Sequence, residues 1–245
     1  AREYAKDRVQ GRTLSAKSGD RVTIIHHPDV RRMLMTMKSQ NEAMRALAYG
    51  VAGSMDLARH HPDITTREAH QARVDLLIPV IKGWFTEGSI KIASLGVQVH
   101  GGMGFIEETG ACQHLRDSRI TTIYEGTTGI QAADLVGRKL SMDQGAAMRA
   151  LIAEIEEVAE KLDQAFGDDM ATIRAGLRDG VRALAEATQW VLATHDANSV
   201  MAVSVDYLML AGVVCGGWQM ARAARAAQRK LKIGDDFSFH EAKLI

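Results

Sequence analysis

Apolar residues recur every three or four positions along most of this 245-residue chain, and only three prolines interrupt the pattern. This spacing is typical of one face of an α-helix. Strands favour β-branched and aromatic residues, whereas aromatic residues make up only 5% of this chain. The sequence therefore predicts an all-α fold built from long helices.

The first long predicted helix covers residues 28–59, a length of about 45 Å at 1.5 Å per residue. Pro28 stands at its start, where a missing N–H group costs nothing, and Pro62 stands just beyond its end. The methionine-rich stripe from Met33 to Met55 is interpreted as core packing and not as a ligand surface.

A second helix is predicted over residues 65–99. Thr65 can cap this helix, because Glu68 follows three residues later and can complete a capping box. Pro79 lies inside the helix and predicts a kink or a one-turn break near Asp75.

Glycines punctuate residues 101–128, where we expect irregular backbone with one short helix over residues 107–115. Binding and catalytic residues are often found on such segments.

Three further helices are predicted after residue 142, joined near Gly167 and Asn198. Their stripes carry little catalytic chemistry, so residues 142–245 are interpreted as an added helical layer on a domain of residues 1–141. The stripes consist of Met148, Leu151, Ile155, Val158, Leu162, Phe166, Met170, Ile173, Leu177, Val181, Leu184, Val191, Val200, Val203, Tyr207, Leu210, Val214, Trp218 and Ala221. The tryptophans lie on or near apolar stripes and are expected in the core: Trp84, Trp190 and Trp218.

The charges balance, with 30 basic and 30 acidic residues, so no global charge draws the chain to nucleic acid or to anionic lipid. The two cysteines, Cys112 and Cys215, form no CxxC motif, which favours a reducing, cytoplasmic setting over a disulfide scaffold. The apolar runs are far shorter than the roughly 20 residues that a membrane crossing needs, so a soluble chain is predicted.

A single carboxylate, Glu125, lies among apolar and hydroxyl-bearing neighbours in residues 120–128. A carboxylate at a pocket wall loses solvation, which makes it a stronger base. Gly126 would let a ligand approach the backbone closely. An alternative is that Glu125 caps a helix that begins near Thr127 and complements its dipole. Local sequence leaves both interpretations open.

Three glycines within four residues, at positions 101, 102 and 104, follow the predicted helix over 65–99. Successive N–H groups at such a turn can surround an anion. The dinucleotide fingerprint is absent, because Glu107 stands where its last glycine would be. The pattern alone predicts a tight turn that ends a helix and can contact phosphate.

Together, these two segments resemble the C-terminal part of the acyl-CoA dehydrogenases. That family carries Gln-x-x-Gly-Gly-x-Gly, then Arg-Asp, then Ile-Tyr-Glu-Gly-Thr, and a Tyr-Ala-x-x-Arg segment leads into its helical bundle. The matching residues here are Tyr4, Ala5, Arg8, Gln98, Gly101, Gly102, Gly104, Arg116, Asp117 and Ile123 to Thr127. Beyond residue 140 the resemblance is to longer bacterial members with a helical extension, which include broad-range and 3-methylthiopropanoyl-CoA dehydrogenases.

The resemblance implies an up-down helical bundle and the chemistry of acyl-CoA oxidation. Glu125 would be the base that removes a proton next to the thioester carbonyl, while the neighbouring carbon passes a hydride to N5 of FAD. The backbone N–H of Glu125 and a ribityl hydroxyl of FAD would bind the thioester oxygen. Tyr124 and Gly126 would then contact the substrate.

The resemblance also implies the residues that bind FAD. Gln98, Gly101 and Gly102 would contact the FAD of a neighbouring subunit, and Arg8 would contact FAD phosphates. Thr127 would lie near the adenine of the FAD of its own subunit. These assignments imply a homodimer or homotetramer, an acyl-CoA substrate and an electron-transfer flavoprotein as partner.

Family members place a helical domain and a β-domain before this region, and neither is in this sequence. The chain is therefore interpreted as a C-terminal portion that by itself binds FAD weakly and lacks activity. Two alternatives stay open, namely an acyl-CoA oxidase with the same base and a helical assembly module without chemistry.

Overall fold

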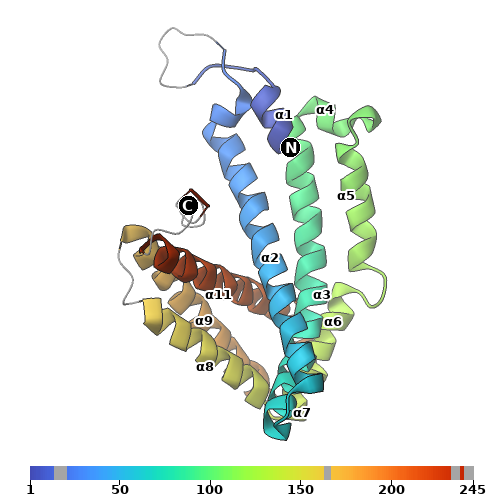
Figure 1. The fold of residues 1–245 in the computed structure, drawn as a ribbon. Helices are drawn as coiled ribbons and strands as arrows, with labels where there is room; N and C mark the ends of the chain where they lie inside the picture. Colours follow the sequence, from blue (N-terminus) through green and yellow to red (C-terminus); the bar gives the residue numbers. More distant parts are fainter. Residues whose placement is uncertain (14–20, 163–166, 233–237, 240–245) are drawn as a thin grey trace. The chain divides into compact units, whose positions relative to one another are not determined.

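The computed structural model describes residues 1–13, 21–162, 167–232 and 238–239. Within these ranges the chain is helical and contains no strand, apart from one isolated antiparallel bridge between Val9 and Thr23. The predicted all-α fold is therefore confirmed (Figure 1). Among the described helices, none has the length and apolar character that a membrane crossing requires.

The α-helices are α1 (Arg2–Asp7), α2 (Pro28–His60), α3 (Ile64–His100), α4 (Gly102–Phe105), α5 (Ala111–Arg119), α6 (Thr128–Asp134), α7 (Leu140–Met142), α8 (Ala146–Lys161), α9 (Asp168–Ala193), α10 (Ala197–Ala202) and α11 (Ser204–Lys232). Three 3-10 turns cover Ile24–His26, Glu107–Thr109 and Ile120–Thr122, and one π-helical stretch covers Leu135–Lys139.

The residues pack into two compact units. Unit 1 comprises Ala1–Glu42 and Phe85–Glu125, and unit 2 comprises Ala43–Trp84 and Gly126–Ile245. The long helices α2 and α3 each contribute one part to each unit.

The core of unit 1 lies where α1 meets the start of α2 and the end of α3. Its buried members are Ala5, Ile24, Met33 and Val99. The rings of Tyr4 and His100 also meet there, with their centroids 4.6 Å apart. The short helix α1 is therefore held against the end of α3.

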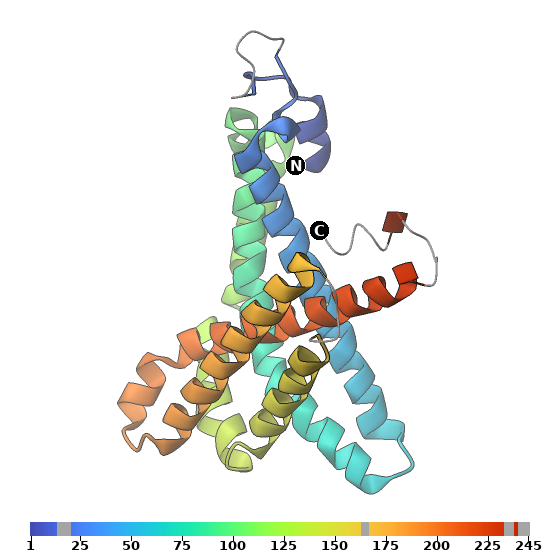
Figure 2. The same cartoon turned by 90° about the vertical axis from the view of Figure 1, so that its left-hand side faces the viewer.

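Unit 2 is built around α11, which packs on α9, α6 and α8. Figure 2 shows α8, α9 and α11 close together in yellow to red. The predicted stripes supply its core, with Met148, Leu151, Ile155, Leu184 and others almost fully buried. Val203 is an exception because it lies in the connection between α10 and α11 and is exposed, and Phe166 lies outside the described residues.

The first two long helices agree closely with their predicted extents, but the start of the second differs in detail. Asp63 provides the cap, because its Oδ2 accepts hydrogen bonds from the backbone N–H (2.8 Å) and the hydroxyl (2.7 Å) of Thr66. The capping box predicted for Thr65 and Glu68 is therefore wrong. Asp63 lies two residues before Thr65 and caps α3 from Ile64 onward, so Thr65 lies inside the first turn of the helix.

Of the kink or one-turn break predicted near Asp75, the break is wrong, since α3 continues through Pro79. Proline cannot donate to the carbonyl four residues earlier, so the helix at this point depends on its packing. Leu76, Leu77 and Val80 are at most 2% exposed, and their burial holds the helical path.

Two other expectations need correction. The short helix predicted over 107–115 is divided, because Gly110 adopts a φ of +75° between the 3-10 turn at Glu107–Thr109 and α5. Trp84 and Trp218 are buried as expected, whereas Trp190 is 46% exposed because α9 directs its neighbour Val191 into the core.

Candidate active site

The segment that carries Glu125 forms a tight turn between the 3-10 turn at Ile120–Thr122 and α6. The N–H groups of Ile123 and Tyr124 donate to the carbonyl of Ile120 at 2.9 and 3.1 Å. Glu125 then adopts a φ of +55° and Gly126 a φ of +90°. A left-handed conformation disfavours a residue with a Cβ, and such residues are concentrated at functional sites.

Thr127 caps the following helix, because its hydroxyl accepts a hydrogen bond from the N–H of Ile130 at 3.3 Å. The alternative in which Glu125 serves as that cap is therefore wrong. Glu125 lies two residues before the cap and belongs to the left-handed turn.

The side chains around this turn face solvent in the described part of the chain. Glu125 is exposed, and the neighbouring Ile123 and Tyr124 are 47% and 50% exposed. The pocket wall expected for Glu125 is therefore not formed by the described residues. Exposed apolar side chains next to an ionisable one form a surface that a ligand or another protein segment could cover.

Lys82 was not singled out by the sequence analysis, but it reaches this turn. Its Nζ donates to the carbonyl oxygen of Gly126 at 2.5 Å, from a partly buried position within α3. A lysine between Ile81 and Gly83 in an otherwise apolar helical stretch was the signal available in the sequence.

The glycine turn lies at the end of α3. The N–H of Gly101 donates to the carbonyl of Gln98 at 3.0 Å, and Gly101 has a φ of +59°. Gly104 is required for packing, because a Cβ there would lie 2.3 Å from the carbonyl oxygen of Val97. By contrast, a Cβ at Gly101 or Gly102 would meet nothing within 4 Å. The first two glycines therefore present accessible backbone, as a ligand site requires.

Arg8 belongs to the same unit as this glycine turn. It follows α1, which packs against the end of α3 through the contact of Tyr4 with His100 (Figure 1). The Arg8 side chain is exposed, while its carbonyl accepts a hydrogen bond from the N–H of Ile24 at 2.8 Å. Arg8 thus follows a helix that contacts the end of α3, the segment that carries Gln98, Gly101 and Gly102.

The glycine turn and the Glu125 turn are separated within unit 1 by α5, which is about 13 Å long at 1.5 Å per residue. Figure 1 shows them at opposite ends of this helix. Arg116 of α5 binds Glu107 through both of its Nη atoms, at 2.7 and 2.9 Å, and so ties α5 to the preceding 3-10 turn. One chain therefore does not bring Glu125 next to the glycines.

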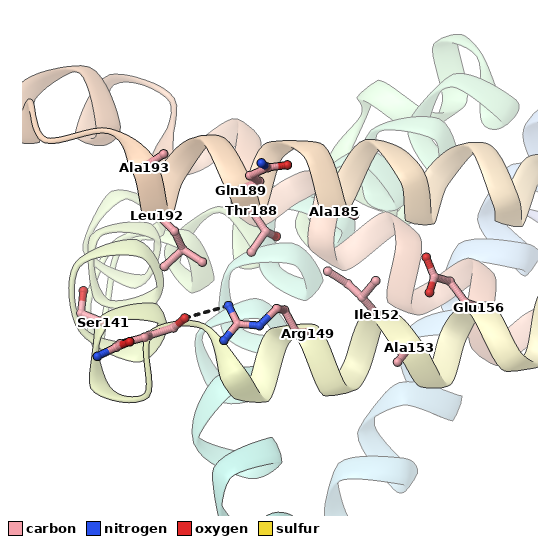
Figure 3. Close-up of a pocket in the computed structure, with 11 residues that line it drawn as sticks. Ser141, Arg149, Ile152, Ala153, Glu156, Ala185, Thr188, Gln189, Leu192 and Ala193 are labelled. Carbon is pink, nitrogen blue, oxygen red and sulfur yellow. Dashed lines mark hydrogen bonds between the residues drawn. The ribbon is translucent and has the colours of Figure 1, made fainter.

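A cavity of about 820 Å³ lies between α8 and α9, and none of the predicted site residues lines it (Figure 3). Arg149 is on its rim and donates to the carbonyl of Gln144 at 2.8 Å, and Ile152 and Leu192 are among the apolar residues of its wall. It has no side-chain arrangement that matches the predicted chemistry.

Comparisons with known proteins identify the family. Residues 1–140 match the family model described as the C-terminal domain of acyl-CoA dehydrogenase, and residues 151–245 match one described as acetyl-CoA dehydrogenase C-terminal like. The chain belongs to the acyl-CoA dehydrogenase family, as its motifs predicted.

Individual relatives agree with this assignment. The chain is 45% identical to 3-methylmercaptopropionyl-CoA dehydrogenase of Ruegeria pomeroyi and 36% identical to the broad-specificity linear acyl-CoA dehydrogenase FadE5 of Mycobacterium tuberculosis. Each match includes 100% of this chain but only 42% of the relative, so the chain spans less than half the length of these enzymes.

The fold also matches a solved structure. An acyl-CoA dehydrogenase of Bacillus anthracis, crystallised with FAD, superposes with a TM-score of 0.66 over 99% of this chain and 41% of that protein, at 17% sequence identity. At this identity the likeness supports the fold alone.

Proposed function

We propose that the complete protein is an FAD-dependent acyl-CoA dehydrogenase and that Glu125 is its base. The observation that carries this proposal is the left-handed turn at Glu125 and Gly126, which holds an exposed carboxylate immediately before α6. We also propose the division into a domain of residues 1–141 and a helical extension of residues 142–245, and the family-model matches to 1–140 and 151–245 support it.

The reaction assigns distinct tasks to the turn. The carboxylate of Glu125 removes a proton from the carbon next to the thioester carbonyl, so that the C–H bond breaks and the proton stays on Glu125. Its backbone N–H donates a hydrogen bond to the thioester oxygen, where negative charge develops. Tyr124 and Gly126 contact the acyl chain. Substrate and the remaining domains would cover the turn and desolvate the carboxylate, which strengthens the base.

The residues present fit FAD. The Arg8 guanidinium, the Gln98 amide and the open backbone of Gly101 and Gly102 form a set of donors suited to pyrophosphate and ribose oxygens. Thr127 would lie near the adenine of the FAD of its own subunit. Bound FAD supplies the acceptor for the hydride that leaves the substrate β-carbon.

The separation of the two turns supports an oligomer. A glycine turn that contacts the FAD of a neighbouring subunit has to lie away from Glu125 of its own chain. The separation of the two turns therefore agrees with this assignment. A homodimer or homotetramer satisfies this arrangement, and an electron-transfer flavoprotein would then reoxidise the enzyme. Cys112 and Cys215 are both free, which favours the cytoplasm as the compartment.

Substitution of the base in the full-length protein tests the proposal. Glu125→Gln should keep the flavin absorbance but lose acyl-CoA-dependent flavin reduction by at least about 1,000-fold, because an amide cannot accept the α-proton. Glu108→Gln is the matched control, since Glu108 is another exposed carboxylate of unit 1. Normal reduction by Glu125→Gln would place the base elsewhere. Peroxide release by the wild type would identify an acyl-CoA oxidase instead.

A further inference from the structure

The contact between Lys82 and the Gly126 carbonyl has no explanation in helix stability. Gly126 lies just before the N-terminus of α6, where the helix dipole disfavours a cation. The 2.5 Å hydrogen bond therefore forms next to a helix end that disfavours a cation.

This hydrogen bond holds the peptide group that directly follows Glu125 and Gly126, the two residues with a left-handed backbone conformation. A glycine at a φ of +90° has wide conformational freedom, so its peptide plane can rotate unless something fixes the carbonyl. Lys82 fixes that carbonyl by donating to it. The backbone N–H and the side chain of Glu125 belong to the turn that immediately precedes this restrained peptide group.

The position of Lys82 is itself determined by the C-terminal extension. Gly83 is so close to α11 that a Cβ would lie 2.7 Å from Cδ2 of Leu208. The next residue, Trp84, packs over Gly212 and Gly216, where added Cβ atoms would lie 2.3 and 2.4 Å from its ring. This part of α3 therefore cannot shift or rotate without displacing α11.

We propose that Lys82 is a positioning residue for the catalytic turn, and that α11 keeps it in place. The sequence of contacts runs from Leu208, Gly212 and Gly216 of α11, through Gly83 and Trp84, to Lys82 and the Gly126 carbonyl. The inference rests on the proposed function of Glu125. It gives the helical extension a task in the reaction besides packing.

The test uses the full-length protein with three substitutions. Lys82→Met should lower kcat about 10- to 100-fold, because small misplacements of a reacting group have effects of this size. Its FAD content and KM should stay within about twofold of the wild type, since Lys82 touches neither ligand in this assignment. Lys82→Arg should recover most of kcat. Lys91→Met, at an exposed position on the same helix, is the matched control and should leave kcat unchanged.

A substrate deuterated at the α-carbon provides the readout that a purely structural role would not change. If Lys82→Met misplaces the base, proton removal becomes slower and the isotope effect on kcat increases. A kcat of Lys82→Met equal to that of the wild type would overturn the inference. Equal losses of kcat in Lys82→Met and Lys82→Arg would also overturn it. If Lys82→Met does not fold, Lys82→Gln carries the same test.

Two further measurements keep the inference separate from the proposed function. Acetylation of lysines in the wild-type protein should be slower at Lys82 than at Lys91, and equal rates would overturn the inference without any substitution. Glu125→Gln is assayed in parallel. If Glu125→Gln is inactive while Lys82→Met is normal, only the inference about Lys82 fails; if Glu125→Gln is active, the assignment of the base fails first.

Discussion

The helical extension and the Glu125 turn differ in side-chain burial and in backbone conformation. In unit 2, α8, α9 and α11 bury their apolar stripes and bring glycines against a tryptophan ring with no spare space. At the Glu125 turn the side chains are exposed and a non-glycine residue has a positive φ. The first arrangement gains stability from burial, whereas the second places a residue with a Cβ in a conformation that costs local stability.

The largest effect on stability should come from adding one methyl group between α11 and α3. Gly212→Ala places a Cβ 2.3 Å from Cγ of Trp84, so the ring or the helix must move. We expect a loss of about 1–3 kcal/mol in the free energy of unfolding, as for other overpacked cores. Denaturant unfolding of the full-length protein measures this loss.

Gly53→Ala on α2 is the control for that experiment, because a Cβ at Gly53 would meet nothing within 4 Å. Alanine favours the helix there and should add up to about 1 kcal/mol. Equal stability of Gly212→Ala and Gly53→Ala would mean that the extension is not tightly packed. The extension would then not differ from the Glu125 turn in its packing.

A methyl group at the turn should impair activity more than stability. Gly126→Ala meets a φ of +90° and an approach of 2.9 Å to Nε2 of Gln131, so the turn must change shape. We expect kcat to fall about 10- to 100-fold, since the adjacent base is displaced. Steady-state kinetics of the full-length protein, with thermal unfolding alongside, measures both effects; a stability loss larger than that of Gly212→Ala would contradict the comparison.

Substitution of Glu125 should separate the effect of backbone strain on stability from the effect of the carboxylate on activity. Glu125→Gly removes a Cβ from a residue at a φ of +55°, and it should raise stability by about 1 kcal/mol while abolishing turnover. The measurement is the denaturant midpoint of this variant against that of Glu125→Gln, which keeps the Cβ. A lower midpoint for the glycine variant would show that the left-handed turn is not strained.

The smallest expected effect concerns pH. Hydrogen bonds from Thr66, first from its hydroxyl, lower the pKa of Asp63 below its ordinary value of 3.8. A lowered pKa means that this carboxylate stabilises the fold above that value and that the contribution is lost as the pH falls below it. Asp63→Asn should therefore reduce thermal stability slightly at neutral pH and by a smaller amount at pH 3. A loss of the same size at both values would mean that ionisation of Asp63 contributes nothing.

Much of the fold could be predicted from local patterns. The prolines that flank the first long helix and the apolar stripes of the extension located the helices, because helix formation and one-sided burial depend on residues three or four positions apart. The motifs around Gly101 and Glu125 identified the family for the same reason, since each is a continuous stretch of sequence. Assignments that depend on competition between neighbours failed, as when Asp63 and not Thr65 capped α3.

Other features depended on residues distant in the chain. Burial of Leu76, Leu77 and Val80 decided that α3 passes Pro79 without a break, and the direction of α9 left Trp190 exposed. Lys82 and Gly126 are 44 positions apart, and only the folded chain brings them together. Sequence by itself determined the helices and the family, because these depend on short-range patterns. Tertiary structure decided that Lys82 contacts the Gly126 carbonyl, because this contact joins two segments that no local pattern connects.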